Sequence, residues 1–169
     1  RDLLESIGYT NVHDDVIRTG LDTFYGTFQP HWKVESDARE TLARLRTMGY
    51  RLGLISNAGD TADVQTLIDR AELRDYFDHI FISAKIGVRK PHHRIFEIAL
   101  DTFHIRPGEA VMVGDALNHD ILGANNTGIA SVWLTRRANK AVNDQFKARV
   151  YPDEILFNLE ELPSILSNW

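Results

Sequence analysis

Polar side chains that could act on a phosphoryl group gather at three places in the sequence. They are Ser56 with Asn57, Lys90, and Asp115 with Asp120. A serine hydroxyl and nearby backbone N–H groups can hold a phosphoryl oxygen, and a lysine ammonium supplies a compact positive charge. Two carboxylates on a tight turn supply hard oxygen ligands, which suit a Mg²⁺ ion that retains several waters. Because phosphoryl transfer depends mainly on positioning and charge neutralisation, these residue types together indicate a Mg²⁺-dependent phosphoryl-transfer site.

Each polar cluster follows a stretch of sequence that is typical of a strand. Strands are expected at residues 51–55, 79–82, 110–113 and 129–134, with 110–113 buried. Helices are expected near residues 36–48, 64–71, 91–103, 120–127 and 158–166, with Ser36 and Asn158 as N-caps and Pro91 at a first turn. This alternation predicts an α/β fold with a doubly wound parallel sheet. Ligands of such sheets bind at the carboxyl ends of the strands, so the three clusters should meet at one edge.

Each cluster taken alone also has an ordinary structural explanation. A Ser-Asn pair after a strand is common turn chemistry, and Lys90 could be a solvated residue before a helix. Asp120 could be an acidic residue favoured by the dipole of a helix N-terminus. His92 and His93 could be ligands, although two histidines at a helix start are more often solvated. The order of the clusters, and the strand before each of them, favour the functional interpretation.

Composition and charge exclude several other classes of protein. The 169 residues are 43% hydrophobic and 25% charged, with a formal net charge of −5, which is ordinary for a globular domain. No long run of one charge sign occurs, so neither nucleic acid nor a membrane surface is expected as a partner. The sequence has no cysteine, which excludes disulfides and thiolate metal sites and is compatible with the cytoplasm. It gives no indication of the oligomeric state.

The three motifs resemble those of the haloacid dehalogenase-like (HAD) hydrolase superfamily, specifically its phosphatase-type members with a helical cap. The matching segments are Leu54-Ile-Ser-Asn57, Ser83-Ala-Lys-Ile-Gly-Val-Arg-Lys-Pro91 and Val113-Gly-Asp-Ala-Leu-Asn-His-Asp-Ile-Leu-Gly-Ala124. They correspond to the second, third and fourth motifs of the family, within a resemblance that covers roughly residues 36 to 166. The resemblance implies a Rossmannoid α/β core over residues 33–169 and, in residues 1–32, the C-terminal part of a helical cap.

The resemblance also implies a role for each site residue. Ser56 would bind the phosphoryl group, with the Asn57 backbone beside it. Lys90 would stabilise the nucleophile and the phosphoryl charge. Asp115 would be the main Mg²⁺ carboxylate of this chain, and Asp120 would support the metal directly or through water. The implied substrate is a small phosphorylated metabolite.

The main departure from the family concerns its first motif. The family carries an Asp-x-Asp segment at the end of its first, central strand, in which one Asp forms an aspartyl-phosphate and the other is the general acid and base. The 169 residues contain no such segment after a strand, and Asp14-Asp15 lies at an expected helix start. Smaller departures are Ala116, where Ser is frequent, and His92-His93, where an acidic residue and Pro are common. We expect an upstream segment to supply the strand and nucleophile, since the chain begins with Arg1 and not Met.

Two alternatives remain open on the sequence alone. A 2-haloacid dehalogenase uses the same nucleophile without a metal, but a halide leaving group does not need the acidic pair. A truncated or degenerate protein could bind a phosphoryl ligand or a partner without catalysis, and without its nucleophile the 169-residue chain should not turn over. Tyr25 and Trp32 are candidate substrate contacts, although such aromatic residues more often serve packing. Because unpaired buried backbone groups are costly, the folded particle should contain the central strand.

Overall fold

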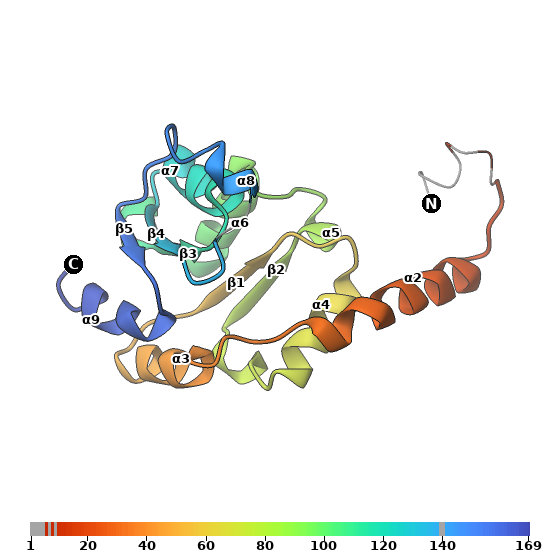
Figure 1. Cartoon of the computed structure of the whole chain (residues 1–169), viewed down its shortest axis with the longest axis horizontal. Helices are drawn as coiled ribbons and strands as arrows, with labels where there is room; N and C mark the ends of the chain where they lie inside the picture. Colours follow the sequence, from red (N-terminus) through yellow and green to blue (C-terminus); the bar gives the residue numbers. More distant parts are fainter. Residues whose placement is uncertain (1–5, 7, 9, 139–140) are drawn as a thin grey trace.

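The chain folds as an α/β protein with parallel strands and helices on both faces (Figure 1). This is a computed structural model, and it describes residues 6, 8, 10–138 and 141–169. The strands are β1 (Gly53–Ser56), β2 (His79–Ile82), β3 (Val111–Gly114), β4 (Ala130–Leu134) and β5 (Glu154–Leu156). The expected fold class is therefore confirmed.

The strands form two parallel ladders. β1 pairs with β2, with Ser56 opposite Ile82, and the second ladder has the order β3-β4-β5, with Gly114 opposite Trp133. The helices are α2 (Asp14–Phe28), α3 (Ala38–Thr47), α4 (Thr61–Arg70), α5 (Ser83–Ile86), α6 (His93–Phe103), α7 (Leu122–Thr127), α8 (Ala141–Asp144) and α9 (Leu162–Leu166). A π-turn over Leu117–Ile121 leads into α7, and short 3₁₀ turns occur at Gln29–His31, Arg74–Tyr76, Pro107–Glu109 and Leu159–Glu161.

Some of the expected element boundaries need correction. Helix α6 begins at His93, where the His92 ring accepts a hydrogen bond from the Arg94 amide, and not at Pro91. Asp37, not Ser36, stands at the N-cap position of α3. Asn158 forms a capping box with Glu161, as expected for the start of the last helical segment. The short elements β5, α5 and α8 were not expected from the sequence.

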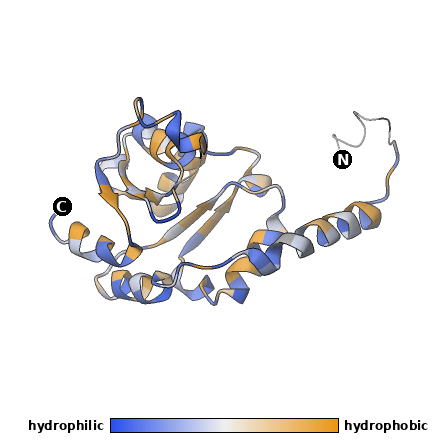
Figure 2. Cartoon of the chain, viewed as in Figure 1, coloured by the Kyte–Doolittle hydropathy of each residue, from blue (hydrophilic) through white to orange (hydrophobic). Residues whose placement is uncertain are grey.

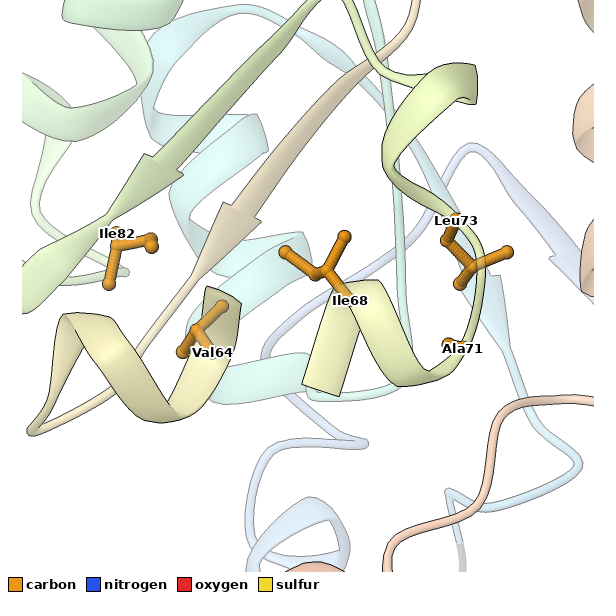
Figure 3. Packing of buried hydrophobic residues seen from close by; sticks show 5 residues of the cluster. All are labelled: Val64, Ile68, Ala71, Leu73 and Ile82. Carbon is orange, nitrogen blue, oxygen red and sulfur yellow. The ribbon is translucent and has the colours of Figure 1, made fainter. Parts of the chain in front are cut away.

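Helices cover the β1–β2 ladder and join it to the second ladder. Val64 and Ile68 of α4 pack with Ile82 of β2 in one buried cluster (Figure 3). On the other side, a cluster built on Ile95 and Phe96 of α6 holds both Ile55 of β1 and Met112 of β3. A third cluster contains Leu45 of α3, Leu162 of α9, Leu52 before β1 and Val111 of β3. Apolar contacts on both faces therefore span the two ladders.

Burial differs between the strands that carry the site and their neighbours. In β4, which pairs with a strand on each side, Ser131 and Val132 are 0% exposed. All four residues of β3 are only half-buried, and so are Leu54, Ile55 and Ser56 of β1. The strand expected at residues 110–113 is therefore present, but the expectation that it is buried is wrong. Among the described residues, β3 has a ladder partner on one edge only, which leaves it half-buried.

Arg136, just after β4, fastens the start of α3 to the core. Its guanidinium donates to Glu35, to both carboxylate oxygens of Asp37 and to the Asn158 side chain. Asp37 is 9% exposed and also accepts a hydrogen bond from the Glu160 amide. The segment before α3 is therefore held by charge-assisted hydrogen bonds, which are stronger than neutral ones.

Helix α2 begins at Asp14, as expected, and extends away from the strands (Figure 1). Figure 2 shows hydrophobic and hydrophilic residues interspersed along it. Val16 and Phe24 are 58% and 56% exposed. No helix in the described part of the chain is long and apolar enough to cross a membrane.

Candidate active site

Lys90 and Asp120 form a buried ion pair at the carboxyl ends of the strands. Lys90 Nζ lies 2.6 Å from Asp120 Oδ1, and their side chains are 10% and 7% exposed. The ammonium also donates to the carbonyl oxygen of Ile55, the residue before Ser56, over 2.7 Å. The loop after β2, the end of β1 and the turn after β3 therefore meet at one point, as the sequence predicts.

Side chains after β1 and β2 fix the backbone that presents Lys90. The side-chain nitrogen of Asn57 donates to the Lys90 backbone carbonyl over 2.9 Å, and the side-chain oxygen of Asn57 accepts from the Lys90 backbone N–H over 2.8 Å. Ser83 bridges the Ala58 amide and carbonyl, with both contacts at 2.9 Å. The Asn57 side chain thus positions Lys90, a role that is additional to the backbone role implied by the family resemblance. Ser56 itself ends β1 and is half-buried.

Glycine at position 114 allows Asp120 to reach Lys90. A Cβ on Gly114 would lie only 2.4 Å from the Cβ and Cγ of Asp120, far inside van der Waals contact. Asp120 Oδ2 accepts a hydrogen bond from the Ala116 amide over 3.0 Å, so both carboxylate oxygens have partners. The close approach in this turn therefore requires a residue without a side chain.

Asp115 directly follows β3, and its main chain is fixed by two side chains from elsewhere. Its carbonyl oxygen accepts from Trp133 Nε1 over 3.2 Å and from Asn143 Nδ2 over 3.0 Å. Sequence reasoning did not single out Trp133, Asn143 or Ser83 for any role at the site. Ser83 lies inside the third motif, so its position was a usable signal, whereas nothing near Asn143 in the sequence indicates its contacts.

The remaining candidates lie in other contacts. The His92 and His93 rings stack at 4.6 Å, and His93 contacts Glu97, so both histidines serve the start of α6. Tyr25 and Trp32 line a cavity of about 280 Å³ between α2 and α4. The Tyr25 hydroxyl would lie 3.0 Å from a Cβ at Gly59, which places it against the loop that follows Ser56.

The residues at this site fit a magnesium ion that keeps several water ligands better than a metal that is coordinated entirely by protein side chains. No group of three or more His, Cys, Asp or Glu side chains with metal-ligand geometry occurs among the described residues. Mg²⁺ keeps several waters and commonly takes one or two carboxylates plus substrate phosphate oxygens, which matches a donor set of Asp115 and Asp120. The turn between them also carries a buried acceptor, Asn118 Oδ1, that has no hydrogen-bond partner in the described part of the chain.

Helix α2 is attached to the loop after Ser56 by an ion pair. Both terminal nitrogens of Arg18 donate to the Asp60 carboxylate, over 3.2 and 2.7 Å, and Asp60 caps α4 through the Ala62 amide. The Arg18 hydrogen bond holds the pKa of the Asp60 carboxyl below its ordinary value, although partial burial opposes this. The position of α2 is thereby linked to the loop that begins at Ser56.

Comparison with known proteins agrees with this geometry. Residues 1–134 match the family model for haloacid dehalogenase-like hydrolases. The chain belongs to this family. It is 35% identical over 150 residues to a glyceraldehyde 3-phosphate phosphatase of Pyrococcus furiosus, an alignment that covers 89% of the chain and 61% of that protein. The chain therefore spans about three fifths of the length of this curated relative.

Solved structures of the same family include both phosphatases and dehalogenases. An HAD phosphatase from Thermococcus onnurineus matches with a TM-score of 0.72 and 30% identity, covering 86% of this chain and 64% of that one. A 2-haloacid dehalogenase from Pseudomonas syringae matches with a TM-score of 0.73 and 28% identity, covering 98% and 67%. The fold alone does not separate the two reactions.

We expect Gly114→Ala to displace Asp120 and break its contact with Lys90. Because the added Cβ meets the rigid inner atoms of a buried side chain, the free energy of unfolding should fall by about 1–3 kcal/mol. Urea denaturation measures this change. Gly108→Ala is the control, since a Cβ at that position meets nothing within 4 Å. Equal stability of the two variants would contradict the close packing of the turn.

Asp60→Asn should loosen α2 while leaving α4 capped, because asparagine is about as good an N-cap as aspartate. At pH 7 the amides of α2 should exchange with deuterium several-fold faster in this variant, after correction for intrinsic rates. The hydrogen bond from Arg18 lowers the pKa of Asp60 in the folded state. The stabilisation from this ion pair is therefore fully present above the unfolded-state pKa of about 3.9, and it is lost as the pH falls through the folded-state pKa.

The exchange rates of wild type and Asp60→Asn should therefore converge at acidic pH. Asp69→Asn, which removes the exposed ion pair of Asp69 with Arg74 instead, should leave α2 unchanged. If Asp60→Asn had no effect on α2 at pH 7, the ion pair would not attach this helix.

Proposed function

We propose that the protein to which this chain belongs is a Mg²⁺-dependent phosphatase of small phosphorylated metabolites. The observation that carries the proposal is the buried contact between Lys90 and Asp120, because it gathers the ends of β1, β2 and β3 into one charged site. In this proposal Ser56 and the Asn57 backbone hold the phosphoryl oxygens, and Lys90 neutralises charge on the phosphoryl group and the nucleophile. Electrostatic stabilisation of this kind is usually the largest contribution to such catalysis.

Asp115 and Asp120 would hold the Mg²⁺ ion, with Asp115 as the main ligand. When bound, the ion supplies charge neutralisation at the phosphoryl oxygens. The Ala116 amide and Lys90 keep the Asp120 carboxylate in place.

The nucleophile and the general acid–base Asp would lie on a segment outside these 169 residues, in an Asp-x-Asp motif that forms an aspartyl-phosphate. Support comes from the strands beside the site. In the described part of the chain β1 pairs only with β2, and β3 only with β4. A further parallel strand between β1 and β3 would satisfy their other edges and bury their half-exposed residues. The 169-residue chain alone should therefore release no phosphate.

The same proposal divides the chain at residue 32. Residues 1–32 would be the C-terminal part of a helical cap, and residues 33–169 the α/β core. The extension of α2 away from the strands supports this division, as does the attachment of Glu35 and Asp37 to Arg136. Tyr25 and Trp32, in the cavity between α2 and α4, would then be candidate contacts for the leaving group.

The phosphatase reaction is favoured over dehalogenation by the acidic turn. Gly114 leaves room for Asp120 in the turn that begins with Asp115, and a halide leaving group would give this acidic pair no role. The relative from Pyrococcus furiosus is a glyceraldehyde 3-phosphate phosphatase, which supports a phosphorylated three-carbon compound as a first substrate to test.

The test uses the protein that contains this chain together with its preceding Asp-x-Asp segment. Phosphate release from glyceraldehyde 3-phosphate, other sugar phosphates and p-nitrophenyl phosphate is measured with Mg²⁺ and with excess EDTA. We expect turnover only with Mg²⁺, and a loss of about 10²–10³ in kcat for Lys90→Met, because a charge aimed at the reacting group is removed. Lys85→Met, an exposed lysine on the same segment, is the matched control and should retain full activity.

Absence of metal-dependent phosphate release in that protein would overturn the proposal. Chloride release from a 2-haloacid in excess EDTA would instead favour the dehalogenase reaction. Phosphate release that is unaffected by Lys90→Met would locate the activity at another site.

A further inference from the structure

Asn143 is a fully buried polar residue that lies far from the site in sequence but contacts it in space. It belongs to the short helix α8 and is 0% exposed. Its side chain reaches the turn after β3, 28 residues earlier in the chain. A buried amide must satisfy its donors and acceptor within the protein, so its partners are informative.

The Asn143 amide holds the main chain on both sides of Ala116. Nδ2 donates to the Asp115 carbonyl over 3.0 Å, and Oδ1 accepts from the Leu117 N–H over 2.9 Å. Nδ2 also donates to the Ala138 carbonyl over 2.8 Å. The amide thus fixes the backbone on either side of one residue and ties it to the segment before α8.

A second side chain acts on the same atom. Trp133 Nε1, from β4, donates to the Asp115 carbonyl over 3.2 Å. Two donors on one carbonyl oxygen use both of its lone pairs, so the peptide plane after Asp115 has little freedom to rotate. The main chain that carries the Asp115 side chain is therefore fixed by residues of β4 and α8.

We propose that Asn143, assisted by Trp133, is a positioning residue that orients Asp115 for binding the divalent cation. This inference rests on the proposed metal role of Asp115. Mg²⁺ demands near-ideal octahedral geometry, so a small rotation of a carboxylate ligand weakens its binding. Groups that orient metal ligands typically change metal affinity about 10–100-fold when removed.

The test measures Mg²⁺ binding by isothermal titration calorimetry, and Mn²⁺ binding by electron paramagnetic resonance, in the full-length protein without substrate. For Asn143→Ala we expect both affinities to fall about 10–100-fold. Trp133→Phe removes the indole N–H together with part of the ring but keeps an aromatic side chain in place, so it should give a smaller loss in the same direction. This milder variant decides the question if Asn143→Ala does not fold.

Ser131→Ala is the matched control for a loss of stability without a change at the site. Ser131 is also 0% exposed in β4, and its hydroxyl lies within hydrogen-bond distance of the Asn125 and Asp153 side chains near the other end of the strand. This variant should lower the melting temperature and leave the metal affinities within about twofold of wild type, since its partners do not orient a ligand.

Unchanged metal affinity in folded Asn143→Ala and Trp133→Phe proteins would overturn the inference and leave Asn143 as an anchor for α8 alone. A wild-type protein that binds neither Mg²⁺ nor Mn²⁺ would instead overturn the proposed metal site, and this inference with it. Weakened binding in the Asn143 and Trp133 variants, with the Ser131 variant unaffected, supports positioning.

Discussion

The buried pair of Lys90 and Asp120 is the interaction on which the arrangement of the site depends. Removing two charges from water costs on the order of several kcal/mol per ion, and the attraction between them offsets this only when further hydrogen bonds satisfy both groups. Here the Ile55 carbonyl accepts a hydrogen bond from the Lys90 ammonium, and the Ala116 amide donates to the second carboxylate oxygen of Asp120. Since these partners come from both ladders, one satisfied charge pair also sets how the ladders meet at their carboxyl ends.

Most regular elements could be predicted because their signal is local. The apolar runs at 51–55 and 79–82 became β1 and β2 within about two residues, and helical spacing found the helices that cover them. Strand β5 was missed because it has only three residues, with Ile155 57% exposed, and so shows no buried run. Helix α8 is a single turn, too short for any periodic stripe.

The site was predictable to the extent that its residues follow strands. Lys90 and Asp120 have chemistry-bearing side chains at strand ends, and the parallel topology brought them together as expected. The contacts that hold these residues were not predictable in the same way. The double hydrogen bond of Asn57 to Lys90 and the reach of Asn143 to Asp115 depend on segments 33 and 28 residues apart, whose relation appears only in three dimensions.

The half-burial of β3 has a similar origin. Its sequence is as apolar as that of a central strand, but burial depends on neighbours as well as on composition. β4, with ladder partners on both edges, reaches complete burial with a serine among its residues. The hydrophobic sequence of a strand thus predicts that it will be buried, and the number of its paired edges decides how far it is buried.

The attachment of Glu35 and Asp37 to Arg136 limits how α2 can swing. Those two carboxylates are bound to a residue after β4, and the Lys33 carbonyl accepts from Arg137. A pivot for the helix cannot lie within that clamped stretch. The stretch of chain between α2 and the strands that is free of this clamp is therefore short, and Gln29 at its start is itself hydrogen-bonded to Asp63 and Arg70 of α4.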